Sequence, residues 1–228
     1  MKLSVLIDAD NASPFVCTEL FTEISKYGVA NVKRAYGDWT VDNLKGWKAV
    51  LHKHAIQPIQ QFSYTTGKNS TDSSLIIDAM DLLHGGKLDG FCIVSSDSDF
   101  TRLATRIRES GLVVYGFGEK KTPDAFISSC DQFIYTEVLK PIAKNVAESI
   151  QEPGLKSSII SAINAVSNDD EWATLAHVGA HITKNDPSFD PRNYGRNKLS
   201  DLVRSLNYIQ TQDRKDGHGR KHIYIKEK

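Results

Sequence analysis

The sequence lacks the features of a secreted or membrane-embedded protein. Its 228 residues contain only three cysteines, Cys17, Cys92 and Cys130, which lie far apart within apolar stretches and form no C-x-x-C pair. This spacing is typical of buried, reduced thiols. No apolar run approaches the roughly 18 residues of a membrane span, and the N-terminal run from Leu3 to Ile7 is too short for a signal peptide. These absences predict a soluble, cytoplasmic protein that does not enter a membrane.

The chain also lacks an excess of charge of either sign. Lysine plus arginine and aspartate plus glutamate number 28 each, so the formal net charge is zero. This balance excludes a uniformly basic nucleic-acid binder, although it leaves room for local basic patches. With 40% hydrophobic residues, the chain can bury one substantial core and a second, smaller one.

Residues 1–140 alternate between short apolar runs and helical patterns, which is the rhythm of an α/β domain with a mostly parallel sheet. The expected strands are residues 3–7, 29–35, 55–62, 90–94 and 112–117. Helices are expected after the first four of them, at residues 14–27, 41–53, 72–83 and 100–110. Pro58 places the third strand near an edge of the sheet, because proline cannot donate a ladder hydrogen bond.

Residues 141–154 are the predicted linker, because prolines and a glycine interrupt regular structure there. Beyond it, residues 155–228 show three helical patterns and then two strand-like runs joined by a turn at Asp216-Gly217. The expected helices are 155–166, 174–183 and 197–206, and the expected strands are 208–212 and 222–226. Three helices and a β-hairpin form the pattern of a small winged-helix domain.

Aspartates lie where the elements of the first domain are expected to meet. Asp8 follows the first strand, and Asp97 and Asp99 follow the fourth, so all three should lie at the carboxyl edge of the sheet. Asp72 shares a helical stripe with apolar residues and should point inward. Crowded carboxylates repel one another unless a cation lies between them. We therefore predict a metal site formed by Asp8, Asp72, Asp97 and Asp99.

The chemistry of these ligands favours particular ions. Mg²⁺ or Mn²⁺ suits oxygen ligands without histidine or cysteine better than Zn²⁺ does. Such an ion could activate water and stabilise the charge of the pentavalent phosphorane that forms when water attacks a phosphodiester. Taken singly, an Asp or Asn after a strand more often caps a turn, and Asn11 could do so here. Asp10 could support the ligands or face solvent, and Asp78 and Asp81 are expected to be solvated.

These residues resemble the NYN domains of the PIN-like ribonuclease superfamily over residues 1–140. The matching segments, in order, are Val5-Leu6-Ile7-Asp8-Ala9-Asp10-Asn11, Lys68-Asn69-Ser70-Thr71-Asp72 and Ser95-Ser96-Asp97-Ser98-Asp99-Phe100. The resemblance implies a PIN-like α/β/α three-layer fold and a metal-dependent RNA nuclease. It also implies that Asp8, Asp72, Asp97 and Asp99 are the catalytic acidic residues, with Asn11 beside them.

Residues 155–228 resemble a LOTUS domain, also called OST-HTH. The likeness lies in Trp172-Ala173-Thr174-Leu175, Gly179, Pro187-Ser188-Phe189-Asp190, Tyr194-Gly195 and Leu199 to Leu202. This resemblance implies RNA binding or a protein partner.

The most basic stretch of the chain, residues 191–221, covers the third helix and the wing of this domain. Basic side chains there suit contacts with RNA phosphates, although a solvated helix face would carry the same charges. The predicted RNA-binding residues of this stretch are Arg196, Lys198, Arg204, Arg214, Lys215, Arg220 and Lys221. Those of the first domain are Lys68, Arg102, Arg106 and Lys120. Trp39 and Tyr64, in expected loops, could stack on nucleotides.

The sequence thus predicts a metal-dependent endoribonuclease whose C-terminal domain binds RNA. One alternative is a non-catalytic RNA-binding regulatory or adaptor protein. Another is a phosphatase of the haloacid dehalogenase type, with Asp8 and Asp10 as its nucleophile and acid and Asp97 with Asp99 as its metal loop. That family expects Thr or Val near position 12, where this chain has Ala12.

Overall fold

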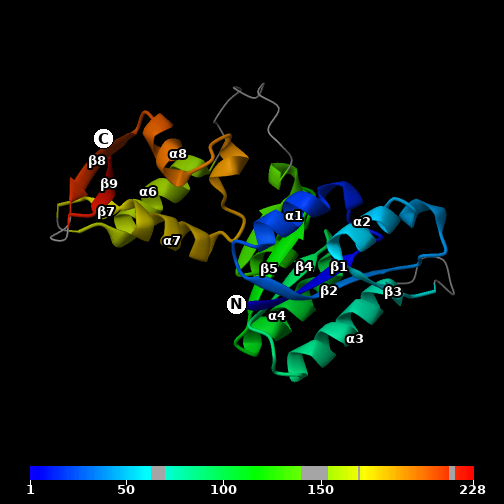
Figure 1. The fold of residues 1–228 in the computed structure, drawn as a ribbon. Coiled ribbons are helices and arrows are strands. Elements are labelled where there is room, and N and C mark those ends of the chain that lie inside the picture. Colours follow the sequence, from blue (N-terminus) through cyan, green and yellow to red (C-terminus); the bar gives the residue numbers. More distant parts are fainter. Residues whose placement is uncertain (63–69, 140–153, 169, 216–218) are drawn as a thin grey trace. The chain divides into compact units, whose positions relative to one another are not determined.

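The computed structural model describes residues 1–62, 70–139, 154–168, 170–215 and 219–228 (Figure 1). The chain divides into two compact units, Met1–Pro141 and Ile142–Lys228. Within the described ranges, no helix combines the length and the apolar character that a membrane crossing requires.

The first unit is built on a six-stranded sheet in the order β3-β2-β1-β4-β5-β6. All its neighbouring strands are parallel, which confirms the predicted α/β fold class. The strands are β1 (Lys2–Asp8), β2 (Val29–Gly37), β3 (Gln57–Gln60), β4 (Gly90–Val94), β5 (Val113–Gly118) and β6 (Gln132–Tyr135). Strand β3, which contains Pro58, lies at an edge as expected. Strand β6 is not among the strands expected from the sequence.

Helices cover both faces of this sheet, so the unit has three layers. Side chains alternate along β1, and Val5 and Ile7 therefore join the buried cluster on one face while Leu6 joins the cluster on the other. The elements of the first face are η1 (Pro14–Val16), α1 (Cys17–Ile24), η2 (Asp42–Leu44), α2 (Trp47–His54) and η4 (Thr136–Leu139). Those of the second are α3 (Ser70–His84), η3 (Ser98–Phe100), α4 (Thr101–Glu109) and α5 (Asp124–Ser129).

The strand order reverses between β1 and β4. The chain runs outward from β1 through β2 to β3 and then returns to pair β4 with the other side of β1. Such a reversal opens a crevice at the carboxyl ends of the two strands, which is where parallel α/β sheets bind ligands. The loops after β1 and β4 carry the predicted acidic residues.

The second unit combines three helices with a small antiparallel sheet in the order β7-β9-β8. Its elements are α6 (Leu155–Val166), β7 (Ala173–Thr174), α7 (Leu175–Asn185), η5 (Pro191–Tyr194), α8 (Leu199–Ser205), β8 (Ile209–Lys215) and β9 (Lys221–Glu227). Three helices and a hairpin were predicted. The short strand β7 was not, and Thr174 at its end caps α7 by accepting a hydrogen bond from the backbone N–H of His177.

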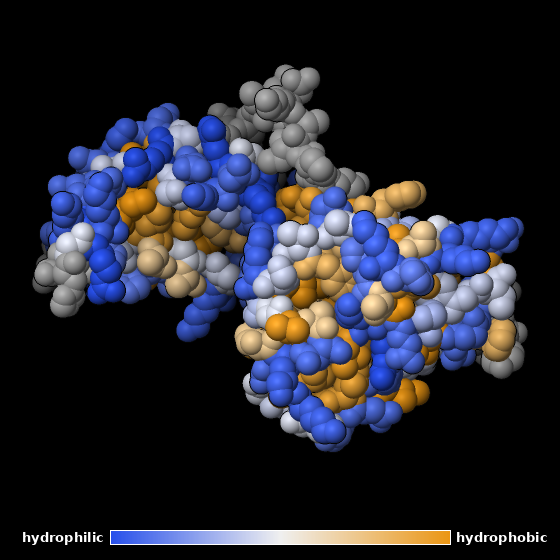
Figure 2. Space-filling view, viewed as in Figure 1, coloured by the Kyte–Doolittle hydropathy of each residue, from blue (hydrophilic) through white to orange (hydrophobic). Residues whose placement is uncertain are grey.

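Each unit has its own hydrophobic core, and polar residues separate the apolar ones that reach the surface. The core of the second unit contains Ile159, Val178 and Ile225. In the view of Figure 2, hydrophobic residues reach the surface in patches separated by hydrophilic ones. The three cysteines are buried and free, as expected, and burial raises the pKa of Cys17 to about 12, which keeps this thiol protonated.

Candidate metal centre

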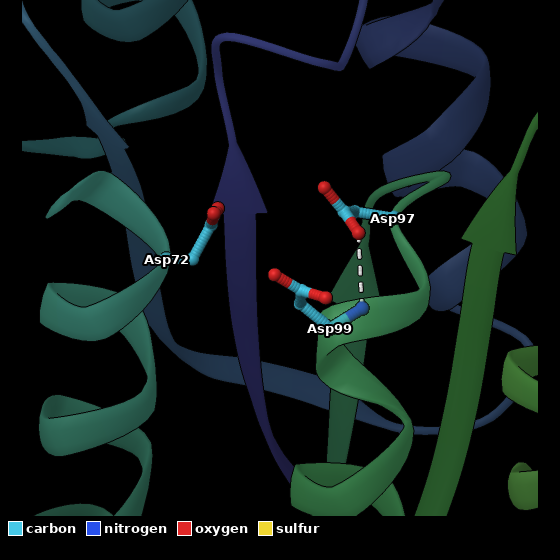
Figure 3. A group of neighbouring side chains, drawn as sticks. All are labelled: Asp72, Asp97 and Asp99. Atoms are coloured by element: carbon cyan, nitrogen blue, oxygen red, sulfur yellow. Dashed lines mark hydrogen bonds between the residues drawn. The ribbon is translucent and has the colours of Figure 1, made fainter. Parts of the chain in front are cut away.

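Three carboxylates of the first unit converge at the carboxyl edge of its sheet. Asp72, Asp97 and Asp99 each offer one oxygen, and these oxygens all lie within 4.8 Å of one another. Asp72 comes from the first turn of α3, whereas Asp97 and Asp99 come from the segment directly after β4 (Figure 3). The structure therefore brings together three of the four predicted ligands, which we call the acid cluster.

A tight turn aims Asp97 and Asp99 at the same point. The Oδ1 atom of Asp97 accepts a hydrogen bond of 2.9 Å from the backbone N–H of Asp99, so Asp97 caps the 3₁₀ turn η3. This turn, drawn with its hydrogen bond in Figure 3, lets both carboxylates face Asp72. Asp97 thus acts as a cap and also lies in the acid cluster.

Asp72 is the buried member of the acid cluster. Helix α3 packs Leu75, Ala79 and Leu83 into the core beneath the sheet, and Asp72 lies at the start of the same buried side with 9% exposure. Burial, together with the negative charges of Asp8 and the neighbouring aspartates, raises the pKa of Asp72 to about 6. A cation at this point would relieve that repulsion.

Asp8 lies beside the acid cluster, on the end of β1. Its Oδ2 atom accepts hydrogen bonds from Ser95 Oγ at 2.7 Å and from Asn11 Nδ2 at 2.9 Å. Asp8 is fully buried, and burial raises its pKa even though these donors oppose the shift. It does not belong to the group of oxygens within 4.8 Å, yet its charge contributes to the raised pKa of Asp72. Its role as a metal ligand therefore stays a prediction.

Ser95 connects the two parts of the site, and the sequence analysis assigned it no role. Its buried hydroxyl donates to Asp8 and accepts a hydrogen bond of 3.1 Å from the backbone N–H of Asp97. Its place in the sequence, as a small hydroxyl residue between a buried strand and Asp97, was the signal that could have identified it. Asn11, for which a capping role and a site role were both open, holds the Asp8 carboxylate. Asp10 is exposed, and its charge also raises the pKa of Asp72.

The expectation that Asp78 is solvated was wrong. Its carboxylate accepts hydrogen bonds from the guanidinium of Arg34 and the hydroxyl of Tyr36, and its side chain is only 23% exposed. Helix α3 packs against β2 as well as β1, so a second side of the helix is covered. Asp81 is exposed, as expected.

The predicted RNA-binding residues of the first unit lie in different places. Arg102 is exposed in the first turn of α4, directly after the acid cluster, and Lys120 is exposed in the loop after β5. Arg106 instead contacts Ser110 Oγ at 3.2 Å, toward the opposite end of α4. Lys68 lies outside the described residues.

Of the two aromatic residues considered for stacking, Trp39 lies within the described residues. The indole N–H of Trp39 donates a hydrogen bond of 2.9 Å to the carbonyl oxygen of Ile59, so this side chain is tied to the edge strand β3. Tyr64 falls outside the described ranges.

Arg204 and Arg214, both predicted to bind RNA, contact other residues of the second unit. Arg204 forms an ion pair of 3.0 Å with Asp213. Arg214 pairs with Asp170, and its guanidinium carbon lies 4.9 Å and 4.5 Å from the ring centres of Trp172 and Tyr224. Arg214 therefore contributes to the packing of the hairpin. The other predicted residues of this unit are all exposed: Arg196, Lys198, Lys215, Arg220 and Lys221.

Comparison with known families divides the chain in the predicted order. The profile of the family described as the NYN domain matches residues 2–139, and that of the family described as the OST-HTH/LOTUS domain matches residues 153–220. No curated protein matches the chain.

Solved structures of other proteins are similar to parts of the chain. A crystal structure of a protein of unknown function from Vibrio parahaemolyticus matches with a TM-score of 0.51 and 17% identity, covering 59% of this chain and 91% of that one. At this identity the likeness supports the fold alone. A solution NMR structure of a protein segment from Chromobacterium violaceum is 40% identical, with a TM-score of 0.29, and covers 34% of this chain and 84% of that one. A solution NMR structure of an uncharacterized protein from Nitrosomonas europaea is 32% identical, with a TM-score of 0.33, and covers 39% of this chain and 85% of that one.

Proposed function

We propose that this chain, which belongs to the NYN family of PIN-like nucleases, is a metal-dependent endoribonuclease whose OST-HTH/LOTUS domain holds the RNA. Membership of the family supplies the nuclease class, and OST-HTH/LOTUS domains bind RNA. The observation that carries the proposal is the convergence of Asp72, Asp97 and Asp99 at the carboxyl edge of the sheet.

The acid cluster fits Mg²⁺ or Mn²⁺. Its donors are all carboxylate oxygens, which these ions prefer. Asp72, Asp97 and Asp99 would hold the ion, because each offers one oxygen and these oxygens all lie within 4.8 Å of one another. Binding of a cation would also keep Asp72 ionised at neutral pH.

The residues around the acid cluster have distinct roles in the proposed reaction. When bound, the ion supplies an activated water and stabilises the charge that develops on the phosphate. Asp72, Asp97 and Asp99 hold it, and no acidic side chain needs to act as the nucleophile. Ser95 and Asn11 fix the buried Asp8 carboxylate beside them.

The phosphatase alternative fits the geometry poorly. It requires the Asp8 carboxylate to attack phosphorus, yet Asp8 is fully buried and accepts hydrogen bonds from Ser95 and Asn11. The adaptor alternative uses the same acid cluster without turnover, and only an activity measurement separates it from the nuclease.

Replacement of Asp97 by asparagine tests the proposal. Asparagine can still accept the hydrogen bond from Asp99 N–H, so the turn should persist, but the cluster loses one negative ligand. We expect Asp97→Asn to lower cleavage of labelled single-stranded RNA in Mn²⁺ by at least about 10- to 100-fold, the loss that follows replacement of a residue that only supports a metal ligand. The affinity for RNA and the unfolding midpoint should stay close to those of the parent protein.

The control is Asp81→Asn, which removes an exposed carboxylate from the same helix as Asp72. It should cleave as fast as the parent protein, and EDTA should abolish cleavage by both. Equal cleavage by Asp97→Asn and the parent would contradict the site. RNA binding by the parent without chelator-sensitive cleavage would instead establish the adaptor alternative.

A further inference from the structure

Phe15 is an aromatic side chain that the fold leaves in solvent. It is 89% exposed, more than any other large hydrophobic residue among those the structure describes. Its sequence neighbours Val16 and Cys17 are buried, so the chain at this point has access to the core and does not use it for Phe15. Single exposed hydrophobic residues are common on proteins, and exposure alone assigns no role. The backbone and the position of Phe15 carry the argument.

The backbone that presents Phe15 is fixed by hydrogen bonds. The N–H of Ala12 donates to the carbonyl oxygen of Asp8 at 2.9 Å, and Asn11 is bonded to the Asp8 side chain. Ser13 then caps the 3₁₀ turn η1, in which Pro14 is the first residue. An aromatic side chain has only two torsions to order, so Phe15 itself loses little entropy when a flat group stacks on it.

The position of Phe15 places it beside the proposed reaction centre. It lies in the segment that follows β1, the strand that ends at Asp8, and therefore at the carboxyl edge of the sheet. Beside it is a small cavity of about 20 Å³ between the loops after β1, β4 and β5. Ser13 and Val16, on either side of Phe15, line this cavity together with Ser95, which bonds the Asp8 carboxylate. Phe15 is therefore held close to the proposed reaction centre, and its exposed ring is open to a nucleobase.

We propose that Phe15 stacks on an unpaired base of the RNA close to the scissile phosphodiester and thereby selects single-stranded RNA. This inference rests on the proposed function. Stacking of a base on an aromatic side chain strengthens binding by about 5- to 150-fold and tolerates any base, because every base has a flat face. In a duplex, neighbouring bases cover those faces. The ring therefore favours loops and single strands without reading a sequence.

The first experiment measures the affinity of full-length protein for a fluorescent single-stranded oligoribonucleotide. The Asp97→Asn background is used so that the RNA stays intact. Phe15→Leu keeps an apolar side chain but removes the ring, and it should weaken binding by about 5- to 150-fold. Phe15→Trp should restore it. The matched control is Val29→Ala, because Val29 is 68% exposed and begins β2 at the opposite end of the sheet.

The second experiment shows whether the lost contact is with a base. In a series of oligonucleotides that each lack one base, one abasic position should weaken binding to the Phe15 protein as much as Phe15→Leu does. With Phe15→Leu, that abasic position should have no further effect, because the two changes remove the same contact. The Phe15→Leu variant and the Phe15 protein should bind a perfect duplex equally well, and the unfolding midpoint should not change.

Two results would overturn the inference. One is equal affinity of Phe15→Leu, Phe15→Trp and Val29→Ala for single-stranded RNA. The other is weaker binding by Phe15→Leu without coupling to any abasic position, which would mean that the ring contacts something other than a base. Failure of the proposed function would give a different result. The parent protein, which carries Phe15, and its variants at position 15 would then all lack cleavage that EDTA abolishes.

Discussion

At the scale of single residues, Asp72 makes the stability of the chain depend on pH. The pKa of Asp72 is raised from its ordinary value of 3.8 to about 6, chiefly by burial and then by the surrounding negative charges. Between these two values the folded chain binds more protons than the unfolded chain, so the free energy of unfolding falls as the pH rises from about 4 to about 6. Burial raises the pKa of Asp8 as well, and its contribution has the same sign.

Asp72→Asn should therefore stabilise the metal-free protein at neutral pH. A pKa unit corresponds to about 1.4 kcal/mol, so the expected gain in EDTA at pH 7.5 is at most about 3 kcal/mol. Near pH 4 the variant and the parent should unfold at nearly the same urea concentration. Adding Mn²⁺ should stabilise the parent more than the variant, because the ion binds only the folded site. A variant less stable than the parent at pH 7.5 in EDTA would show that repulsion at Asp72 is not the dominant effect.

At the scale of elements, long apolar runs predicted the buried strands reliably. Strands β1 and β4 are buried on both faces, so each appears as a continuous apolar run that predicts a parallel sheet. Strand β6 has four residues and α5 has six, which is too short for a periodic pattern to mark either of them. The acid cluster was predictable because parallel strands share a carboxyl edge and α3 has a clear apolar side.

Contacts between distant side chains were the part that the sequence could not supply. The bonds from Arg34 and Tyr36 to Asp78 depend on how α3 lies across β2, which a helical stripe does not specify. Likewise, the charge of Arg214 indicated a phosphate contact, whereas its guanidinium stacks on Trp172, more than 40 residues away in the chain. Both arrangements are set by tertiary packing.

Gly118→Ala should disturb the acid cluster from the neighbouring strand. A Cβ atom at this position, the end of β5, would lie 2.6 Å from the carbonyl oxygen of Ser95 and 2.7 Å from Thr122 Oγ1. The carbonyl can move only with the segment that holds Asp97. We expect the free energy of unfolding to fall by about 1–3 kcal/mol, as in other overpacked sites, and RNA cleavage to fall with it.

Gly46→Ala is the control for this substitution. Gly46 has a helical conformation with φ −62°, and its Cβ would lie 3.4 Å from the nearest atom, in Pro14. Alanine should therefore be neutral or stabilise the protein by about 0.4–1 kcal/mol. Urea unfolding and cleavage assays on both variants test the comparison. Parent-like stability and cleavage of Gly118→Ala would contradict the close approach of β5 to Ser95, two residues before Asp97.

At the scale of the whole molecule, the chemistry is expected to reside in the first unit, and the phosphate contacts that hold the RNA are expected to lie mainly in the second. The acid cluster belongs entirely to the first unit, and each unit buries its own hydrophobic core. The exposed basic residues Arg196 and Lys198 lie in the second unit, on the segment that leads into α8. The acid cluster and these two basic residues share no partner among the described residues. Substitutions in the cluster and at the basic residues should therefore have additive effects on the free energies of RNA binding and cleavage.

The double variant Arg196→Ala/Lys198→Ala tests this separation. Each lost phosphate contact should reduce the dependence of log affinity on log salt concentration by about 0.7 for single-stranded RNA, so the slope should become shallower by up to about 1.4. KM for RNA cleavage should rise while kcat stays near that of the parent, whereas Asp97→Asn should lower kcat with little change in affinity. Lys184→Ala, an exposed lysine on α7, should leave the slope unchanged. An unchanged slope in the double variant would place the phosphate contacts elsewhere on the second unit or in the first, where Arg102 and Lys120 would be the next pair to replace.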